Sequence, residues 1–151
     1  MAEEIHLKVW VPIQDFSGDY LEKVKFVEDR EGLEISLENE EQEFKLIYNN
    51  LELGNFVFAL KLSSELVYSH YSRAARKARK EFFGRSTKHW FFYKAIRSDF
   101  LEWFTENSGL EIEKDSIEHH IISTSETTFE ILSSYTPEVI TTNKTDKHKT
   151  E

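Results

Sequence analysis

Apolar and polar side chains alternate along much of the first third of the chain. In residues 5–13 every second side chain is aliphatic, and similar short stretches follow at residues 21–28, 33–38 and 44–48. A period of two places one face of a strand on a core and the other face in solvent. The polar turns between these stretches predict an N-terminal antiparallel meander. Residues 55–62 are more continuously apolar, and they predict a fifth, more completely buried strand.

The hydrophobic period changes after Leu62. From Leu66 to Phe82 the apolar side chains recur at the spacing of one face of a helix. Ser63 or Ser64 supplies an N-cap, and Gly84 suits the position that follows the last helical turn. The pattern therefore predicts a helix over residues 64–83.

The second half of the chain mixes strand and helix patterns. Residues 88–96 are rich in aromatic side chains and predict a buried strand. Ser98 is a good N-cap for a second helix over residues 99–107. Residues 117–124 and 128–134 predict a β-hairpin across a short polar turn.

This order of elements predicts one α+β domain over residues 1–140. It consists of an antiparallel β-sheet of about seven or eight strands packed with two α-helices. Regular alternation of strands and helices, which a doubly wound α/β fold requires, is missing from the first sixty residues. Residues 141–151 contain no apolar side chain and predict a disordered polar tail.

Composition narrows the class of protein. The chain has 151 residues, of which 39% are hydrophobic, so it can form a core of ordinary size. It has no cysteine, which excludes disulfides, cysteine-based zinc sites and a thiol nucleophile. The acidic start is unlike a secretory leader, and no apolar run approaches the length of a membrane span. We therefore expect a cytoplasmic protein.

Signatures of catalysis and of cofactor binding are missing from the sequence. Neither a glycine-rich phosphate loop nor a Gly-x-Ser-x-Gly turn occurs. His119 and His120 are adjacent in a predicted strand, so their side chains point to opposite faces and cannot share a metal ion. The sequence thus predicts no cofactor, no metal site and no catalytic residue.

Charge is distributed unevenly along the chain. The formal net charge is −9, yet residues 71–97 contain nine Lys and Arg and a single acid, Glu81. Such a stretch either packs against the acidic remainder or forms a surface for an anionic partner. The candidate anion-binding patch consists of the cationic residues around the first helix: Arg73, Arg76, Lys77, Arg79, Lys80, Arg85 and Lys88.

The flanking segments are acidic and offer a surface of the opposite sign. Complementary charge speeds the association of proteins, so these acids are candidates for contact with a basic partner. They comprise a predicted turn and a later loop: Glu38, Glu40, Glu41, Glu43, Glu111, Glu113 and Asp115.

One part of the chain resembles known sequences. Residues 98–104 (SDFLEWF), Ser108-Gly109, residues 117–124 (IEHHIIST) and the stretch from Ile131 to Pro137 are similar to small uncharacterised bacterial proteins. The resemblance covers residues 98–137 and follows a capped helix and a hairpin. It implies a family of unknown function and an immunity-type role, and it brings no active-site residues with it.

Three functions remain open from the sequence. The first is a non-catalytic protein-interaction module, of immunity or accessory type, whose acidic surfaces mask a basic partner. The second is binding of nucleic acid or another anionic ligand through residues 73–88. The third is a small enzyme with an unrecognised site of histidine and carboxylate side chains. The sequence does not specify the oligomeric state.

Overall fold

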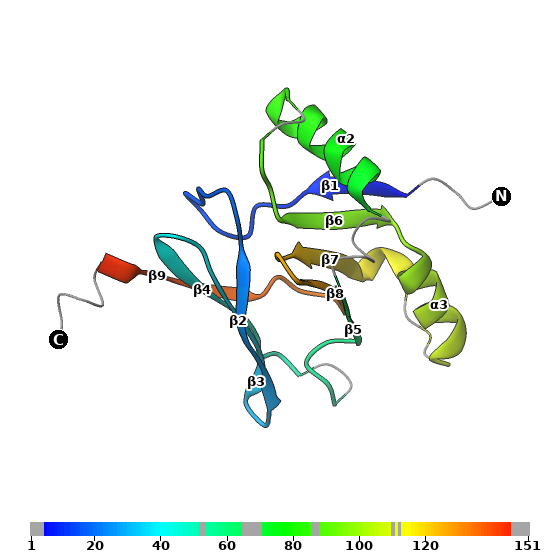
Figure 1. Cartoon of the computed structure of the whole chain (residues 1–151). Coiled ribbons are helices and arrows are strands. Elements are labelled where there is room, and N and C mark those ends of the chain that lie inside the picture. The colour runs from blue at the N-terminus through cyan, green and yellow to red at the C-terminus, as the bar shows by residue number, and fades with distance from the viewer. Residues whose placement is uncertain are drawn as a thin grey trace.

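The computed structural model describes residues 5–51, 54–64, 71–85, 88–109, 111 and 113–145. Within these ranges nine strands form two antiparallel sheets, and two α-helices complete an α+β fold (Figure 1). The predicted fold class is confirmed. The strands divide into two sheets where the sequence pattern predicted one, because the first and fifth strands pair away from the meander.

The four-stranded sheet contains the predicted meander. Its strands are β2 (Glu22–Asp29), β3 (Gly32–Glu38), β4 (Gln42–Tyr48) and β9 (Glu138–Asn143), in that spatial order. Alternate residues of β3 and β4 face inward and are fully buried, as the period of two predicted. They are Leu33, Ile35, Leu37, Phe44, Leu46 and Tyr48.

Strand β9 corrects the prediction for the C-terminal segment. Residues 141–143 were expected in a disordered tail, but they pair with β4, and Asn143 lies opposite Gln42. A helical turn follows at residues 144–145, and residues 146–151 lie outside the described residues. The strand lacks an apolar pattern because it is an edge strand whose side chains are mostly exposed.

The five-stranded sheet has the order β1-β6-β7-β8-β5. Its strands are β1 (His6–Val9), β6 (Phe92–Arg97), β7 (Glu118–Ser123), β8 (Thr127–Ser133) and β5 (Ala59–Ser64). The predicted hairpin is confirmed as β7 and β8. Strand β5 was expected to be more completely buried than the strands of the meander, and this was wrong: it is an edge strand with partly or fully exposed side chains.

The two helices differ in how well the sequence predicted them. Helix α2 (Ser72–Phe83) ends as expected, with Gly84 in the left-handed conformation at φ 80°. Its predicted N-cap is wrong, because Ser63 and Ser64 belong to β5; residues 65–70 lie outside the described residues. Helix α3 (Asp99–Asn107) is confirmed, and Ser98 caps it by accepting a hydrogen bond from the Leu101 N–H.

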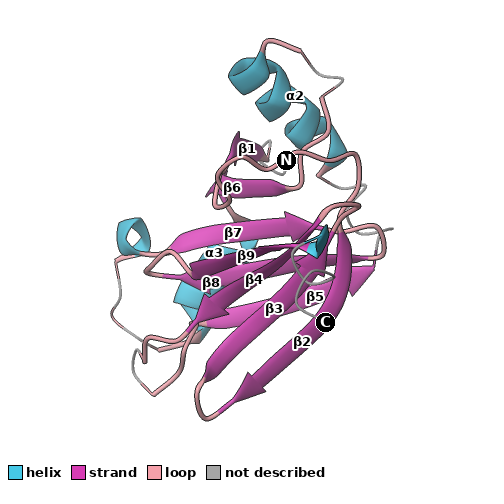
Figure 2. Ribbon diagram, turned by 90° about the vertical axis from the view of Figure 1, so that its left-hand side faces the viewer, coloured by secondary structure: helices cyan, strands magenta, loops and turns pink. Residues whose placement is uncertain are grey.

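Both faces of the five-stranded sheet are covered. One face packs on the four-stranded sheet, where the rings of Phe26 and Phe129 stack with centroids 5.9 Å apart. The other face packs against the helices. Figure 2 shows α2 beyond β1 at one end of the molecule, and its buried residues are Ala75 and Ala78. No helix in the described part of the chain is long and apolar enough to cross a membrane.

Candidate functional site

The exposed face of α2 carries a row of cations. Arg73, Arg76, Lys77 and Lys80 are exposed, on the side of the helix opposite the buried Ala75 and Ala78. Their spacing of three and four residues places them in one stripe. None of the four forms an ion pair with a carboxylate among the residues that the structure describes. We call these four residues the cationic face.

Arg79 lies differently from its neighbours. Its Nη1 donates a hydrogen bond of 2.9 Å to the hydroxyl of Tyr93, which is fully buried in β6. The Tyr93 hydroxyl in turn donates to the carbonyl of Trp90 at 3.1 Å. Arg79 therefore ties α2 to the sheet, and the cationic face continues without it.

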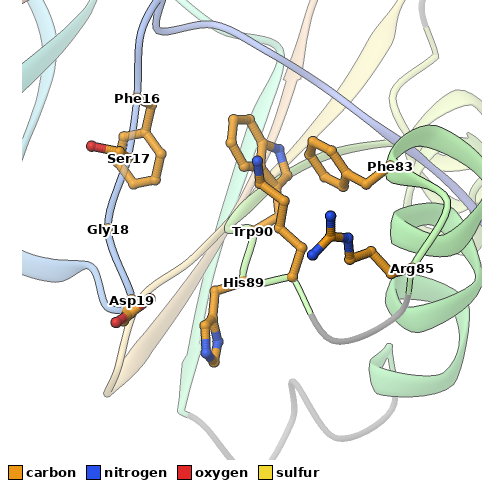
Figure 3. Close-up of a pocket in the computed structure, with 9 residues that line it drawn as sticks. Phe16, Ser17, Gly18, Asp19, Phe83, Arg85, His89 and Trp90 are labelled. Atoms are coloured by element: carbon orange, nitrogen blue, oxygen red, sulfur yellow. The ribbon is translucent and has the colours of Figure 1, made fainter.

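A pocket of about 480 Å³ lies at the C-terminal end of α2. Figure 3 shows Phe83 and Arg85 on one side of it and the loop carrying Phe16 and Asp19 on the other. Lys88 is also at this pocket, and its Nζ lies 4.6 Å from the centre of the Phe83 ring. The pocket thus places Arg85 and Lys88 of the predicted patch at one site.

The floor of the pocket is aromatic. Trp90 is buried, and its ring meets Phe83 and Phe16 with centroids 5.4 Å away in each case. Its Nε1 donates to the carbonyl of Trp10 at 2.9 Å, which fixes the indole in place. Trp90 is buried and held in place, so it belongs to the core. The exposed rim of the pocket includes Arg85 and Lys88, and Asp19 lies on its other side.

The predicted acidic residues do not form one group. Four of them lie in or beside the β3–β4 turn of the four-stranded sheet, whereas Glu111, Glu113 and Asp115 precede β7 of the other sheet. In Figure 1 the turn lies beside the red C-terminal end of the chain, and the yellow segment before β7 lies beside α3. Glu38 is also engaged within the fold, because Lys144 lies 3.4 Å from its carboxylate.

Buried polar side chains form a second cluster beneath α3. Nε2 of His119 lies 3.0 Å from Oε1 of Glu130, and Nδ1 lies 2.5 Å from Oγ of Ser98. The hydroxyl of Tyr71 donates to the same Glu130 oxygen at 2.5 Å. His119 is 1% exposed and Glu130 is fully buried, so the imidazole and the carboxylate lie inside the fold.

The charge of Glu130 determines which hydrogen bonds it can accept. Burial raises the pKa of Glu130, but hydrogen bonds from His119 and Tyr71 outweigh it, and the net shift is downward. An ionised carboxylate only accepts hydrogen bonds, so Nε2 of His119 carries a proton. Whenever Nδ1 carries no proton, it accepts the hydrogen bond that the Ser98 hydroxyl donates.

His120 forms a separate network on the opposite face of the sheet. Its Nδ1 lies 2.8 Å from the hydroxyl of Tyr48, and its Nε2 lies 3.2 Å from Oε1 of Glu118. Lys94 donates to the other oxygen of Glu118 at 2.7 Å. Burial lowers the pKa of His120, which keeps the ring neutral. The hydrogen bond from His120, supported by Lys94, lowers the pKa of Glu118 to about 2.

The side chains of His119 and His120 point to opposite faces of the sheet, as their adjacent positions in a strand predicted. His119 contacts Glu130 on the helix side, and His120 contacts Tyr48 on the side of the second sheet. Among the described residues no three histidine or carboxylate groups are placed to hold a metal ion.

Sequence reasoning missed the cluster of Ser98, His119 and Glu130. The three residues come from different elements, and each alone has an ordinary explanation as a cap or a strand residue. One signal pointed to it: Glu130 is a charged residue within the otherwise apolar stretch from Phe129 to Leu132.

The comparisons with protein family models, with curated proteins and with solved structures give no match for this chain. The resemblance of residues 98–137 to small bacterial proteins therefore stays a prediction.

Proposed function

We propose that this protein binds the phosphate backbone of a nucleic acid through the cationic face of α2, with Arg85 and Lys88 extending the contact. The observation that carries the proposal is the unpaired state of the four cations. They share one exposed face and form no ion pair with a carboxylate in the described ranges. Cations that the fold does not neutralise are available to an external anion.

The spacing of the cationic face suits a row of phosphates. A helix rises about 1.5 Å per residue, so Arg73 and Lys80 are about 10 Å apart along the axis. The long side chains can each reach a separate phosphate, and the arginines can do so with two parallel hydrogen bonds. A phosphate backbone offers charges at this scale along its whole length.

The packing of α2 favours a nucleic acid over a lipid surface. A helix that lies in a membrane interface inserts its apolar face into the lipid. In this protein Ala75 and Ala78 on that side of α2 are buried in the hydrophobic core, and Phe82, near the C-terminal end of the helix, is exposed at 56%. One exposed ring does not form an apolar face for insertion, whereas the cationic face is exposed along the helix.

The acidity of the whole chain weakens the interaction without abolishing it. A net charge of −9 opposes long-range attraction to nucleic acid. At physiological salt, however, exposed charges are screened over about 8 Å. Figure 1 shows α2 at the far side of the five-stranded sheet from the β2–β3–β4–β9 sheet, whose acids are therefore strongly screened at the cationic face. We expect modest affinity that depends steeply on salt.

A protein partner for the acidic residues has weaker support. The acids fall into two groups on different sheets, so no single acidic surface supports an immunity-type or accessory role. That role stays a prediction. A cytoplasmic location belongs to our proposal, since nucleic acid is the partner.

Fluorescence anisotropy with a labelled single-stranded oligonucleotide and its duplex tests the proposal. Four phosphate contacts predict that the logarithm of the association constant falls with the logarithm of salt concentration with a slope of about −3. Charge reversal by Arg76→Glu with Lys77→Glu should weaken binding at least about tenfold and flatten the slope by about 1 to 2.

The matched control is Lys23→Glu with Lys25→Glu. These two exposed lysines lie on β2, in the other sheet, and their reversal changes the net charge by the same amount. The control should change affinity much less than the α2 variant. Equal loss in both variants, or an absence of binding by the unaltered protein at low salt, would refute the proposal.

A further inference from the structure

A hydrogen-bonded chain runs from the protein's surface to a buried carboxylate. Ser98 is half-buried at the junction of β6 and α3, and its hydroxyl points to Nδ1 of His119. Nε2 of His119 points to Glu130, which is fully buried in β8. Nucleophilic catalysis uses this order of groups: a hydroxyl, a base, and a third group that orients the base.

We propose that Ser98, His119 and Glu130 form a catalytic triad that hydrolyses small neutral esters by acyl transfer. Ser98 is the nucleophile and His119 is the general base. Glu130 is a positioning residue, which acts through His119. This activity is independent of nucleic-acid binding by α2.

The N-terminus of α3 activates the serine. The Leu101 N–H donates to Ser98 Oγ at 3.0 Å, so it stabilises negative charge on that oxygen. The same bond leaves the hydroxyl proton free to point to His119. The first N–H groups of a helix lack partners within the helix, and the helix dipole favours an anion at this end. The amides that follow Ser98 are thus suited to receive the oxyanion of a tetrahedral intermediate.

Glu130 is difficult to explain as a stabilising residue alone. Burying a carboxylate is costly, and a well-packed apolar side chain often serves the stability of a fold as well or better. Glu130 nevertheless stays ionised through His119 and Tyr71, and Lys61 lies 3.5 Å from its second oxygen. That second oxygen has no hydrogen-bond partner in the described part of the chain. Such buried charges are concentrated at functional sites.

An apolar groove beside the serine can take the acyl group. Its volume is about 630 Å³, and its lining includes Lys61, Asp99, Phe100 and Trp103. Asp99 and Phe100 directly follow Ser98, and the Phe100 ring packs edge-on against His119 with centroids 5.5 Å apart. Trp103 is 57% exposed and stacks on Phe100, so the groove opens to solvent.

The lining of the groove sets the class of substrate. The aromatic rings of Phe100 and Trp103 favour an apolar acyl chain. Asp99 and Lys61 bring opposite charges to the lining, so neither an anionic nor a cationic substrate gains a net attraction. A short, uncharged aliphatic or aryl ester fits both conditions.

The reaction proceeds in two steps, acylation of Ser98 and hydrolysis of the acyl-serine. Ser98 Oγ attacks the ester carbonyl while its proton moves to Nδ1 of His119, and the resulting tetrahedral intermediate collapses with cleavage of the ester C–O bond. The alcohol leaves with the proton from Nδ1, and an acyl-serine remains. Water then gives a proton to Nδ1 and attacks the acyl carbon. Ser98 Oγ regains that proton as the acid departs.

The first test is covalent labelling of the full chain with a fluorophosphonate, followed by intact mass and peptide mapping. The probe should label Ser98 in the unaltered protein. Ser98→Ala should abolish labelling, and so should Ser98→Asn, which retains an N-cap and controls for loss of α3. Ser125→Ala, which alters an exposed serine in the β7–β8 turn, should leave labelling unchanged.

The second test follows hydrolysis of p-nitrophenyl butyrate. His119→Asn should lower kcat by about 100-fold or more, the usual contribution of a general base. In Glu130→Gln the amide can donate to Nε2, which leaves Nδ1 protonated and unable to accept the serine proton. We expect kcat to fall at least about tenfold with KM unchanged, because the groove is intact.

Two results would overturn the triad. One is a folded, unaltered protein that neither reacts with the fluorophosphonate nor hydrolyses the ester above the rate of Ser98→Asn. The other is labelling that persists in Ser98→Asn and maps to another residue. Either result leaves the cluster as a structural tie between α3 and the sheet. Nucleic-acid binding is measured separately and is unaffected by either outcome.

Discussion

The hydroxyl of Tyr48 lies 2.8 Å from Nδ1 of His120, and this hydrogen bond joins the two sheets inside the core. Tyr48 belongs to β4 and His120 to β7, and neither side chain is exposed. Trp10 stacks on the imidazole with ring centroids 4.3 Å apart, which closes the site from the other side. The neutral histidine accepts this bond and donates to Glu118, so both ring nitrogens are satisfied.

Tyr48→Phe should destabilise the protein although it removes a single oxygen. The substitution leaves Nδ1 of His120 buried without a donor, which costs about 1–3 kcal/mol. Urea unfolding measures the loss. Tyr20→Phe is the control, because Tyr20 is 37% exposed and its hydroxyl has no hydrogen bond in the described residues. A change of less than about 0.5 kcal/mol is expected there. Equal effects in the two variants would contradict the role of the buried bond.

Acidification should weaken the fold in two stages. Burial lowers the pKa of His120 below its ordinary 6.5, so the unfolded chain gains a proton on this side chain before the folded protein does. Stability from this group is present above pH 6.5 and falls as the pH drops below it. The hydrogen bond from His120 lowers the pKa of Glu118 from 4.5 to about 2. Its contribution is present above pH 4.5 and is lost as the pH approaches 2.

Glu118→Gln isolates the second stage. The free energy of unfolding of this variant should fall less between pH 4.5 and 2 than that of the unaltered protein. Glu126→Gln is the control, since Glu126 is an exposed turn residue without an ion pair among the described residues. Its curve should run parallel to that of the unaltered protein. A Glu118→Gln curve that also stays parallel would show that the carboxylate does not stabilise the fold.

Local patterns account for most of the elements that the sequence predicted correctly. Strands β3 and β4 bury every second residue, and α3 has a capping serine whose side chain accepts from the first turn. These signals act within a few residues, so they are visible in one sequence. Strand β9 is different because it is held by backbone pairing with β4, almost a hundred residues earlier. Its exposed threonines give no hydrophobic period.

The division into two sheets depends on pairing over long distances. Strand β1 lies beside β6, and Leu7 faces Ala95 across the pair. Strand β5 lies beside β8, where Leu62 faces Phe129. Neither pairing leaves a trace in the spacing of apolar residues. The cluster of Ser98, His119 and Glu130 depends on the pairing of β6 with β7 and of β7 with β8, which is why residue types alone did not reveal it.

Substitution by alanine should lower stability at Arg79 and lower oligonucleotide affinity at Arg76. Arg79→Ala removes the hydrogen bond to Tyr93 and should cost about 1 kcal/mol of stability. Arg76→Ala alters an exposed side chain and should change stability by less than about 0.5 kcal/mol. In the oligonucleotide assay the order reverses, and Arg76→Ala should weaken binding more. Thermal unfolding and anisotropy of both variants test this, and the same ranking in the two assays would contradict the separate roles.

Gly84→Ala should destabilise the C-terminal end of α2. Gly84 has φ 80°, a left-handed conformation that costs a residue with a Cβ about 1–2 kcal/mol. A Cβ at this position meets no atom within 4 Å, so the cost comes from the backbone alone. Gly84→Asn should cost less, because asparagine tolerates this conformation better. The Tm measured by thermal unfolding should therefore be highest with glycine at this position, lower with asparagine and lowest with alanine. Equal stability of the alanine variant and the unaltered protein would mean that α2 ends in another way.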